Sequence, residues 1–280
     1  MKDTIFPVDF ETGEVVQGIT MIDADGWQQI AARKKRQESS DMRRLDHGSL
    51  GKFYLSTTRD KQFRKLSPQD VTRLIYLASY LKYKNILMLT ERRAMKLDDI
   101  APVLRVSAST AKRFWDKVNG RYICQNDDQT LTIKDCFFMG KQKRIKERLT
   151  KFYINAIRNL YESTSTSKHS CLGRIFELLA YINTEYNILC HNPEETDLSK
   201  VIPMTLRQFC EATGYDVSKA HRLAQEISAI TFDVDGEQRH FVAFVTTNAI
   251  SNDRLIVVNP RIIYGGHNYE RVEAFALFFK

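Results

Sequence analysis

The sequence predicts an α+β protein in which one supersecondary plan occurs twice. Three observations carry this prediction: an internal repeat, two short helices with helix-turn-helix spacing in each copy, and short apolar strands around them. The chain has 280 residues, of which 43% are hydrophobic and 27% are charged. This length is enough for two ordinary domains, and this composition excludes wholesale disorder.

The repeat consists of sequence blocks that recur in the same order. The matching blocks are RLIYLASYL (73–81) with RIFELLAYI (174–182), NILM (85–88) with NILC (187–190), residues 97–118 with 206–227, and LTIKDCFFMG (131–140) with LIVVNPRIIYGG (255–266). The third pair aligns without gaps, so that Ala101 matches Cys210 and Arg113 matches Arg222. The second copy has a longer segment, residues 228–254, between its last helix and its last strand.

Local signals predict the elements of each copy. In the first copy, apolar residues at helical spacing predict a helix that begins after the N-cap Ser67, with Pro68 at its first position. A short apolar strand follows over residues 86–89, then two short helices, then a hairpin over residues 121–134 with the turn NDDQ. The order helix, strand, helix, helix, hairpin is the winged-helix plan. We therefore expect two tandem winged-helix domains.

The parts around these domains complete the predicted organisation. The predicted segments are an N-terminal extension over residues 1–66 with a hairpin, a basic helix and an arm, a first winged-helix domain over 67–141, a connecting basic helix and linker over 142–170, and a second winged-helix domain over 171–280. Residues 142–162 are expected to form one helix with an apolar stripe and a basic face. That face is either solvated or lies across phosphates, and both roles are compatible.

The segment 97–118 has the features of a helix-turn-helix. Ala101 is a small residue where the second helix crosses the first, Val106 is an apolar residue in the turn, and Ser107 is an N-cap for the second helix. Position 105, which is commonly glycine in such turns, is Arg105. The second helix, residues 108–118, is expected to bury Ala111, Phe114 or Trp115, and Val118, and to present small polar and basic residues outward.

These outward residues predict a double-stranded DNA partner. The candidates for reading bases in the major groove are Ser109, Thr110, Lys112 and Arg113. The candidates for binding phosphates are Ser107, Lys117, Arg121, Lys143, Arg144, Arg148 and Lys151, and weaker contacts are expected from Ser218, Lys219, His221 and Arg222 in the second copy. Residues 67–170 carry a net charge of +10 and residues 171–280 a net charge of −4, so the first copy is expected to bind DNA more tightly.

Sequence signals for other classes of protein are missing. No metal-ligand spacing, phosphate loop, dinucleotide fingerprint or nucleophile elbow is found, so we expect no catalytic residue, no metal and no cofactor, and hence not an enzyme. The five cysteines form no C-x-x-C pair and are expected to be reduced thiols. No apolar run approaches the roughly 20 residues of a membrane span, and no signal peptide is visible, so a cytoplasmic protein without a membrane partner is expected.

Several motifs together carry a family resemblance. They are ETGEVV near the start, GKFYL at 51–55, LSPQDVTRLIYLASYL, VSASTAKRFW, and the endings LTIKDCFFMGK and IVVNPRIIYGG. With these motifs the chain resembles the tandem winged-helix proteins of phages and plasmids of Gram-positive bacteria, which are replication initiators or helix-turn-helix regulators. The last ending is also similar to that of RepL-type plasmid replication proteins.

The resemblance implies sequence-specific DNA binding without catalysis, in the cytoplasm of a bacterial host. It implies a role in transcription regulation or DNA replication of a mobile genetic element, and leaves promoter and origin as alternatives. The other hypothesis is an interaction module that engages a polymerase, the replisome or another phage or host protein, because the second copy is acidic and carries the long segment. A homodimer is left open.

Overall fold

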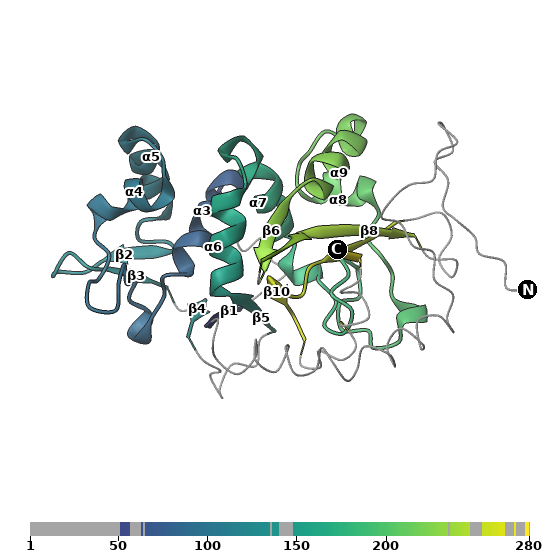
Figure 1. Ribbon diagram of the computed structural model, residues 1–280, viewed down its shortest axis with the longest axis horizontal. Helices are drawn as coiled ribbons and strands as arrows, with labels where there is room; N and C mark the ends of the chain where they lie inside the picture. The colour runs from purple at the N-terminus through teal and green to yellow at the C-terminus, as the bar shows by residue number, and fades with distance from the viewer. Residues whose placement is uncertain are drawn as a thin grey trace, which may run out of the picture. The chain divides into compact units, whose positions relative to one another are not determined.

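The computed structural model describes residues 51–56, 63, 65–134, 136–139, 148–234, 236–246, 254–266, 272 and 278–279 (Figure 1). The described residues form an α+β structure of seven α-helices with several small antiparallel sheets and hairpins. Contacts divide the chain into two compact units, one of residues 50–180 and one that contains residues 181–280. Within the described ranges, no helix is both long enough and apolar enough to cross a membrane. The predicted N-terminal hairpin and basic helix lie outside the described residues.

Two helices form the centre of the first unit. The helix α3 (Pro68–Ala78) begins as predicted, with Ser67 as N-cap accepting a hydrogen bond from the backbone N–H of Asp70. It packs on α7 (His169–Glu177), the first helix of the second copy. The two backbones are in direct contact, because a Cβ atom at Gly173 would lie 1.7 Å from the carbonyl oxygen of Pro68. The first helices of the two copies thus pack against each other.

The predicted helical pair and hairpin follow in the same unit. The helix α4 (Ile100–Leu104) is followed by α5 (Ala108–Val118), and the strands β2 (Ile123–Gln125) and β3 (Leu131–Ile133) form an antiparallel hairpin (Figure 1). These boundaries confirm the predicted elements. The predicted strand over residues 86–89 is absent, and isolated bridges occur there in its place: Leu81 with Leu87, Ile86 with Thr132, and Met88 with Ala94.

The predicted helix over residues 142–162 is confirmed over residues 154–162 and wrong over residues 149–153. The strand β5 (Leu149–Tyr153) precedes a shorter helix, α6 (Ile154–Ser163), and residues 142–147 lie outside the described ranges. β5 pairs with β1 (Lys52–Ser56), which also pairs with β4 (Phe137–Phe138). Phe53 and Phe152 stack at 4.9 Å between ring centroids. The pairing of β5 with a strand about one hundred residues away outweighs a local apolar spacing that also fits a helix.

The second unit repeats the pair of helices and adds strands. Its helices are α8 (Leu206–Ala212) and α9 (Ala220–Ser228). A hairpin of β6 (Thr231–Val234) and β7 (Glu237–His240) precedes the pair β8 (Val242–Thr246) and β9 (Arg254–Val258), and β10 (Ile263–Tyr264) follows. The long segment 228–254 therefore contains a hairpin without a counterpart among the described residues of the first copy. Phe279 packs on a core that includes Val245 and Val257.

Backbone hydrogen bonds confirm the internal repeat. The matching pairs of bonds, donor first, are Met95–Leu87 and Met204–Leu189, Met88–Tyr80 and Cys190–Tyr181, and Val106–Ala101 and Tyr215–Cys210. Two left-handed residues also recur, Asn85 with Asn187 and Arg105 with Gly214. The division by contacts places α7 with residues 50–180 rather than with the second copy. The predicted domain boundaries stay a prediction.

Candidate nucleic-acid interface

The helix α5 has one buried face and one exposed face. Ala111 and Val118 are buried as predicted, and Phe114 and Trp115, which the sequence offers as alternatives, are both buried. Its N-cap is Ser107, whose hydroxyl accepts a hydrogen bond from the backbone N–H of Thr110 at 3.3 Å. Ser109, Lys112 and Arg113 are exposed, and Thr110 is half-buried. The four predicted base-reading residues therefore begin at the N-terminus of α5 and cover its first two turns.

The turn before α5 is held by the helix α6. Arg105 caps α4 in the left-handed conformation, with φ of 54°, at the position of Gly214 in the second copy. Its side chain is 63% exposed, and its Nη2 atom lies 2.8 Å from Oε2 of Glu162. The hydroxyl of Tyr161 donates to the carbonyl oxygen of Leu104 at 2.9 Å. The sequence shows Arg105 only as a departure from glycine, whereas the structure pairs its guanidinium with Glu162 of α6.

Below α5, the buried carboxylate of Asp70 gathers three donors. Lys117 Nζ lies 2.5 Å away, Arg73 Nη1 2.6 Å and Ser67 Oγ 2.8 Å, and the Asp70 side chain is 3% exposed. Burial by itself would raise the pKa of Asp70, but the hydrogen bonds from Lys117, Ser67 and Arg73 outweigh it and lower the pKa below its ordinary value. Lys117, a predicted phosphate contact, is thus directed toward α3 with 46% of its side chain exposed.

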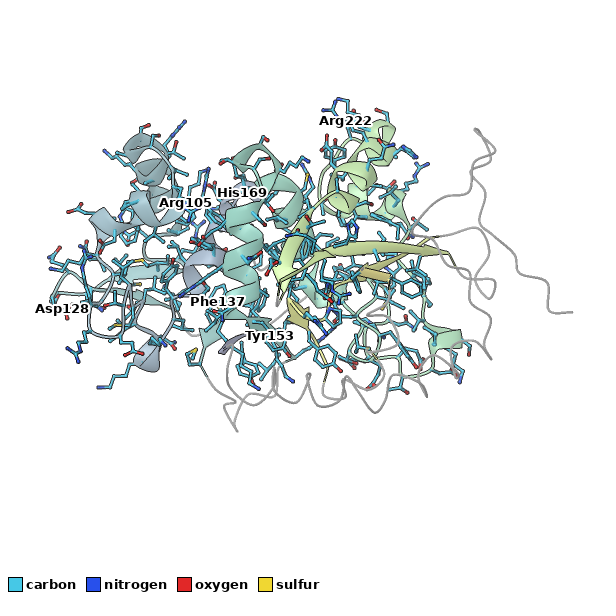
Figure 2. All side chains as sticks on the ribbon, viewed as in Figure 1. Arg105, Asp128, Phe137, Tyr153, His169 and Arg222 are labelled. Atoms are coloured by element: carbon cyan, nitrogen blue, oxygen red, sulfur yellow. The ribbon has the colours of Figure 1, made fainter. Side chains whose placement is uncertain are left out.

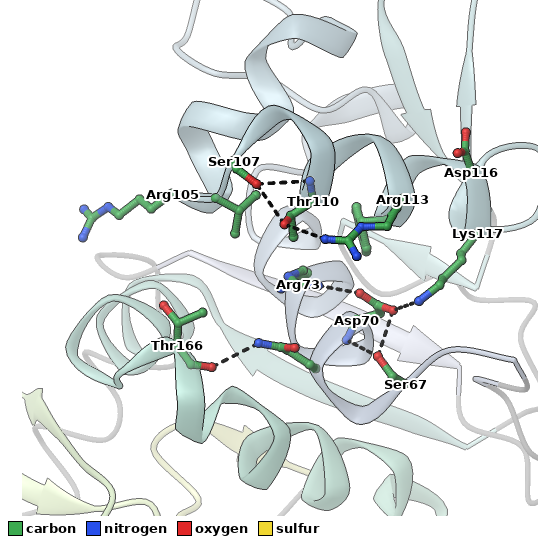
Figure 3. Close-up of a pocket in the computed structure, with 13 residues that line it drawn as sticks. Ser67, Asp70, Arg73, Arg105, Ser107, Thr110, Arg113, Asp116, Lys117 and Thr166 are labelled. Carbon is green, nitrogen blue, oxygen red and sulfur yellow. Dashed lines mark hydrogen bonds and ion pairs between the residues drawn. The ribbon is translucent and has the colours of Figure 1, made fainter.

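These groups line one groove beside α5. The groove has a volume of about 760 Å³ and is lined by residues of α3, the α4–α5 turn, α5 and Thr166. Figure 3 shows Lys117 reaching from α5 to Asp70 on α3. On the opposite wall, Gln69 Nε2 donates to the carbonyl oxygen of Thr166 at 3.1 Å. Sequence reasoning missed Asp70, Arg73 and Gln69, and the available signal was the sequence SPQDVTR, which places a cap, an acid and an arginine on one side of the helix start.

The other predicted phosphate contacts do not form one surface on a single helix. Arg121 is exposed just after α5. Arg148 donates from Nη1 to the carbonyl oxygen of Ala180 at 2.9 Å, and Lys151 is half-buried in β5. Lys143 and Arg144 lie outside the described residues. The predicted basic helix face over residues 143–151 is therefore wrong for Arg148 and Lys151, because residues 149–153 form a strand.

The matching face in the second unit is neutralised. Arg222, labelled in Figure 2, lies on α9. Its Nε atom lies 2.8 Å from Glu226 Oε1, and Lys219 Nζ lies 3.4 Å from Asp216 Oδ2. Ser218 donates from its hydroxyl to Asp216 at 2.7 Å, and His221 is exposed. In the gapless alignment, Glu226 stands where the first copy has Lys117, and Asp216 stands where it has Ser107. At these two positions the first copy has a neutral serine and a lysine, whereas the second copy has an aspartate and a glutamate.

The turn between β2 and β3 is acidic, as the sequence predicts. Asp127 and Asp128 are both exposed there. Hydrogen bonds from the hydroxyl and the backbone N–H of Thr130 lower the pKa of Asp128, which keeps this carboxylate ionised. An ionised carboxylate repels phosphate, so the turn itself is a poor contact for a polyanion.

Comparison with known proteins gives no relative of this chain. No protein-family model, no curated protein and no solved structure matches it. Over the ranges that the structure describes, no group of three or more His, Cys, Asp or Glu side chains is placed to hold a metal ion. The groove and the exposed face of α5 therefore carry the functional argument.

Proposed function

We propose that this chain binds double-stranded DNA in a sequence-specific manner, with α5 in the major groove. The observation that carries the proposal is the α5 helix, which is anchored by a fully apolar face and presents serine, threonine, lysine and arginine on the other. In this proposal α4, α5 and the β2–β3 hairpin are the working parts of a winged-helix domain. The repeated backbone bonds support a second domain of the same kind.

The proposed division of labour follows side-chain chemistry. Ser109 is small and lets the helix approach base edges closely, while Lys112 and Arg113 are long enough to reach guanine O6 and N7. Among the described residues, Arg113 donates long hydrogen bonds within its own helix, 3.4 Å to Ser109 O and 3.3 Å to Thr110 Oγ1. Such weak bonds can be exchanged for a base at small cost. In this proposal the protein acts by binding alone and catalyses no reaction.

The phosphate contacts in this proposal come from residues that flank the reading face. Ser107 and Lys117 on α5 and Arg121 after it are the proposed first-copy contacts. Arg148 and Lys151 are proposed only as secondary contacts, because both belong to the folded sheet region. From the resemblance to phage and plasmid proteins, we further propose that the bound site is a promoter or a replication origin of a mobile genetic element.

A pair of matched variants tests the assignment of α5. The bound sequence is first selected from random double-stranded DNA with the full chain. Arg113→Ala is then compared with Arg222→Ala, the same substitution at the counterpart position of α9. We expect Arg113→Ala to lose roughly 1–3 kcal/mol at one base pair and to relax selectivity there. Arg222→Ala should change binding little, because Glu226 already pairs with this arginine. Unchanged selectivity of Arg113→Ala refutes the assignment.

A second candidate function is an interaction module. It is favoured by two observations in the second unit: the cations of α9 pair with acids, and Val217 and Ile202 are 36% and 57% exposed. Exposed apolar side chains beside a neutral helix suit a protein partner better than DNA. The partner would be a polymerase, another replication protein or a second copy of the chain. Failure of the full chain to retain any genomic fragment at low salt would favour this function over the first.

A further inference from the structure

The groove beside α5 has the chemistry of a phosphate site. We propose that it holds a phosphate of the DNA backbone, so that the start of α3 and the segment at Thr166 belong to the DNA interface. This inference rests on the proposed function and extends it to residues outside the α4–α5 pair. It assigns roles to Gln69 and Arg105, for which the sequence predicts none.

The charges of the groove favour an anion. Four cationic side chains line it, contributed by α3, the α4–α5 turn and α5: Arg73, Arg105, Arg113 and Lys117. Two acids also line it, but the carboxylate of Asp70 is 3% exposed and already accepts three hydrogen bonds. The other acid, Asp116, is solvent-exposed. The net charge of the lining residues is therefore positive, with the buried acid serving to hold Lys117 in place.

Hydrogen-bond donors in the groove point to the same ligand. Arg73 is 7% exposed, and its Nε atom makes no hydrogen bond to the described residues. The N-caps of α3 and α5, both helices of 11 residues, are part of the lining, and helix N-termini attract anions. The hydroxyl of Thr110, which accepts hydrogen bonds from Ser107 Oγ and Arg113 Nη2, has its own proton to donate. A volume of about 760 Å³ is many times the roughly 30 Å³ share of one water, which suits a passing strand better than a single ion.

Glu162 competes with phosphate for the guanidinium of Arg105. The side chains of Arg105 and Glu162 are 63% and 36% exposed, and their Nη2 and Oε2 atoms lie 2.8 Å apart. Exposed ion pairs of this kind are weak. A bound phosphate can therefore take Arg105 from Glu162, and removal of the Glu162 charge should strengthen DNA binding.

Three amide–carboxylate exchanges in the full chain test the groove, because they add or remove a negative charge and should change DNA affinity in opposite directions. Gln69→Glu adds a negative charge inside it, Glu162→Gln removes one beside it, and Asn155→Asp adds one on the exposed side of α6, outside the lining. Binding to the selected DNA site is measured by fluorescence anisotropy over a series of salt concentrations. We expect Gln69→Glu to weaken binding roughly threefold to tenfold at low salt, Glu162→Gln to tighten it about twofold to threefold, and Asn155→Asp to leave it unchanged. An acidic residue in the first turn of α3 suits the helix dipole. Because Gln69→Glu also loses the hydrogen bond to the carbonyl oxygen of Thr166, its denaturation midpoint is compared with that of the wild type.

The salt dependence gives a further readout. Arg105→Ala should reduce the slope of log Kd against log salt concentration by about one and weaken binding equally on all sequences. Equal binding by Gln69→Glu, Glu162→Gln and Asn155→Asp overturns the inference. A second outcome also overturns it. In that outcome inorganic phosphate, added at constant ionic strength, stabilises the wild-type chain, but the three variants bind DNA as the wild type does. The groove would then bind a free anion and not the DNA backbone. If the wild-type chain retains no DNA, the proposed function itself fails.

Discussion

Gly173→Ala is a sharp test of the packing between α3 and α7. Helix propensity alone predicts that alanine stabilises α7 by about 1 kcal/mol. The structure predicts the opposite, because the added Cβ would lie 1.7 Å from the carbonyl oxygen of Pro68, 2.3 Å from its carbonyl carbon and 2.7 Å from its Cα. All three are backbone atoms, so no rotamer change can relieve the overlap.

The size of the effect follows from this geometry. Cβ contacts below 3.0 Å are essentially never seen, so the helices must separate by more than an ångström at this point. Separation also disturbs the bond from Thr72 Oγ1 to the carbonyl oxygen of His169, which is 2.7 Å long. Overpacking of this kind costs about 1–3 kcal/mol and occasionally more. After the gain in propensity, we expect a net loss of about 1 kcal/mol, and of up to about 2 kcal/mol where the overlap is not relieved.

Chemical denaturation of the full chain, followed by circular dichroism, measures this loss as a lower midpoint with an unchanged slope. Gln225→Ala is the control, since it places alanine at an exposed position in α9 and changes propensity without overlap. We expect this control to be neutral or slightly stabilising. A Gly173→Ala protein at least as stable as the wild type would refute the close approach of α3 and α7.

Three further predictions concern buried groups. Burial raises the pKa of Glu177 to about 7, despite the opposing charge of Arg174. The wild-type chain therefore loses stability as the pH rises from about 4.5 through 7. In denaturation, Glu177→Gln should be more stable than the wild type by about 1 kcal/mol at pH 8 and equally stable near pH 4. Burial lowers the pKa of His169 below its ordinary value, so the denaturation midpoint should fall as the pH drops below about 6.5, and this fall should flatten in His169→Gln. Phe279→Ala should cost about 3–5 kcal/mol, because Phe279 is 1% exposed in the core of the second unit, while the half-buried Phe278→Ala should cost clearly less.

The parts of the fold that the sequence predicts correctly are fixed by local rules. Ser67 and Ser107 cap α3 and α5 as expected, because a serine hydroxyl satisfies a free N–H at a helix start. The apolar spacing of α5 predicts the burial of Ala111 and Val118 and of an aromatic residue between them, and both Phe114 and Trp115 are buried. The strand β5 could not be predicted, since Leu149, Phe152 and Ala156 have helical spacing. Residues 149–153 form a strand because they pair with the distant strand β1.

The site divides in the same way. The exposed residues of α5 follow from helical periodicity, so the candidate reading face could be predicted. Its supports could not, because Lys117 pairs with Asp70 across 47 residues and Arg105 with Glu162 across 57 residues. Such pairs depend on how three helices pack, and a single sequence carries no direct signal for that packing.

The internal repeat allows α5 of the first copy to be compared with α9 of the second copy. Arg113 and Arg222 occupy the same position after the same left-handed turn, yet their surroundings differ in charge. One lies a turn from Lys117, whose charge adds to its own, and the other is paired with Glu226. The bond that closes the turn before each helix recurs, from Val106 to Ala101 and from Tyr215 to Cys210, so the turn itself does not explain this difference in charge. A polyanion would therefore bind preferentially to the first copy, and the neutral helix of the second copy, with Val217 exposed at its start, is suited to a different task on the same scaffold.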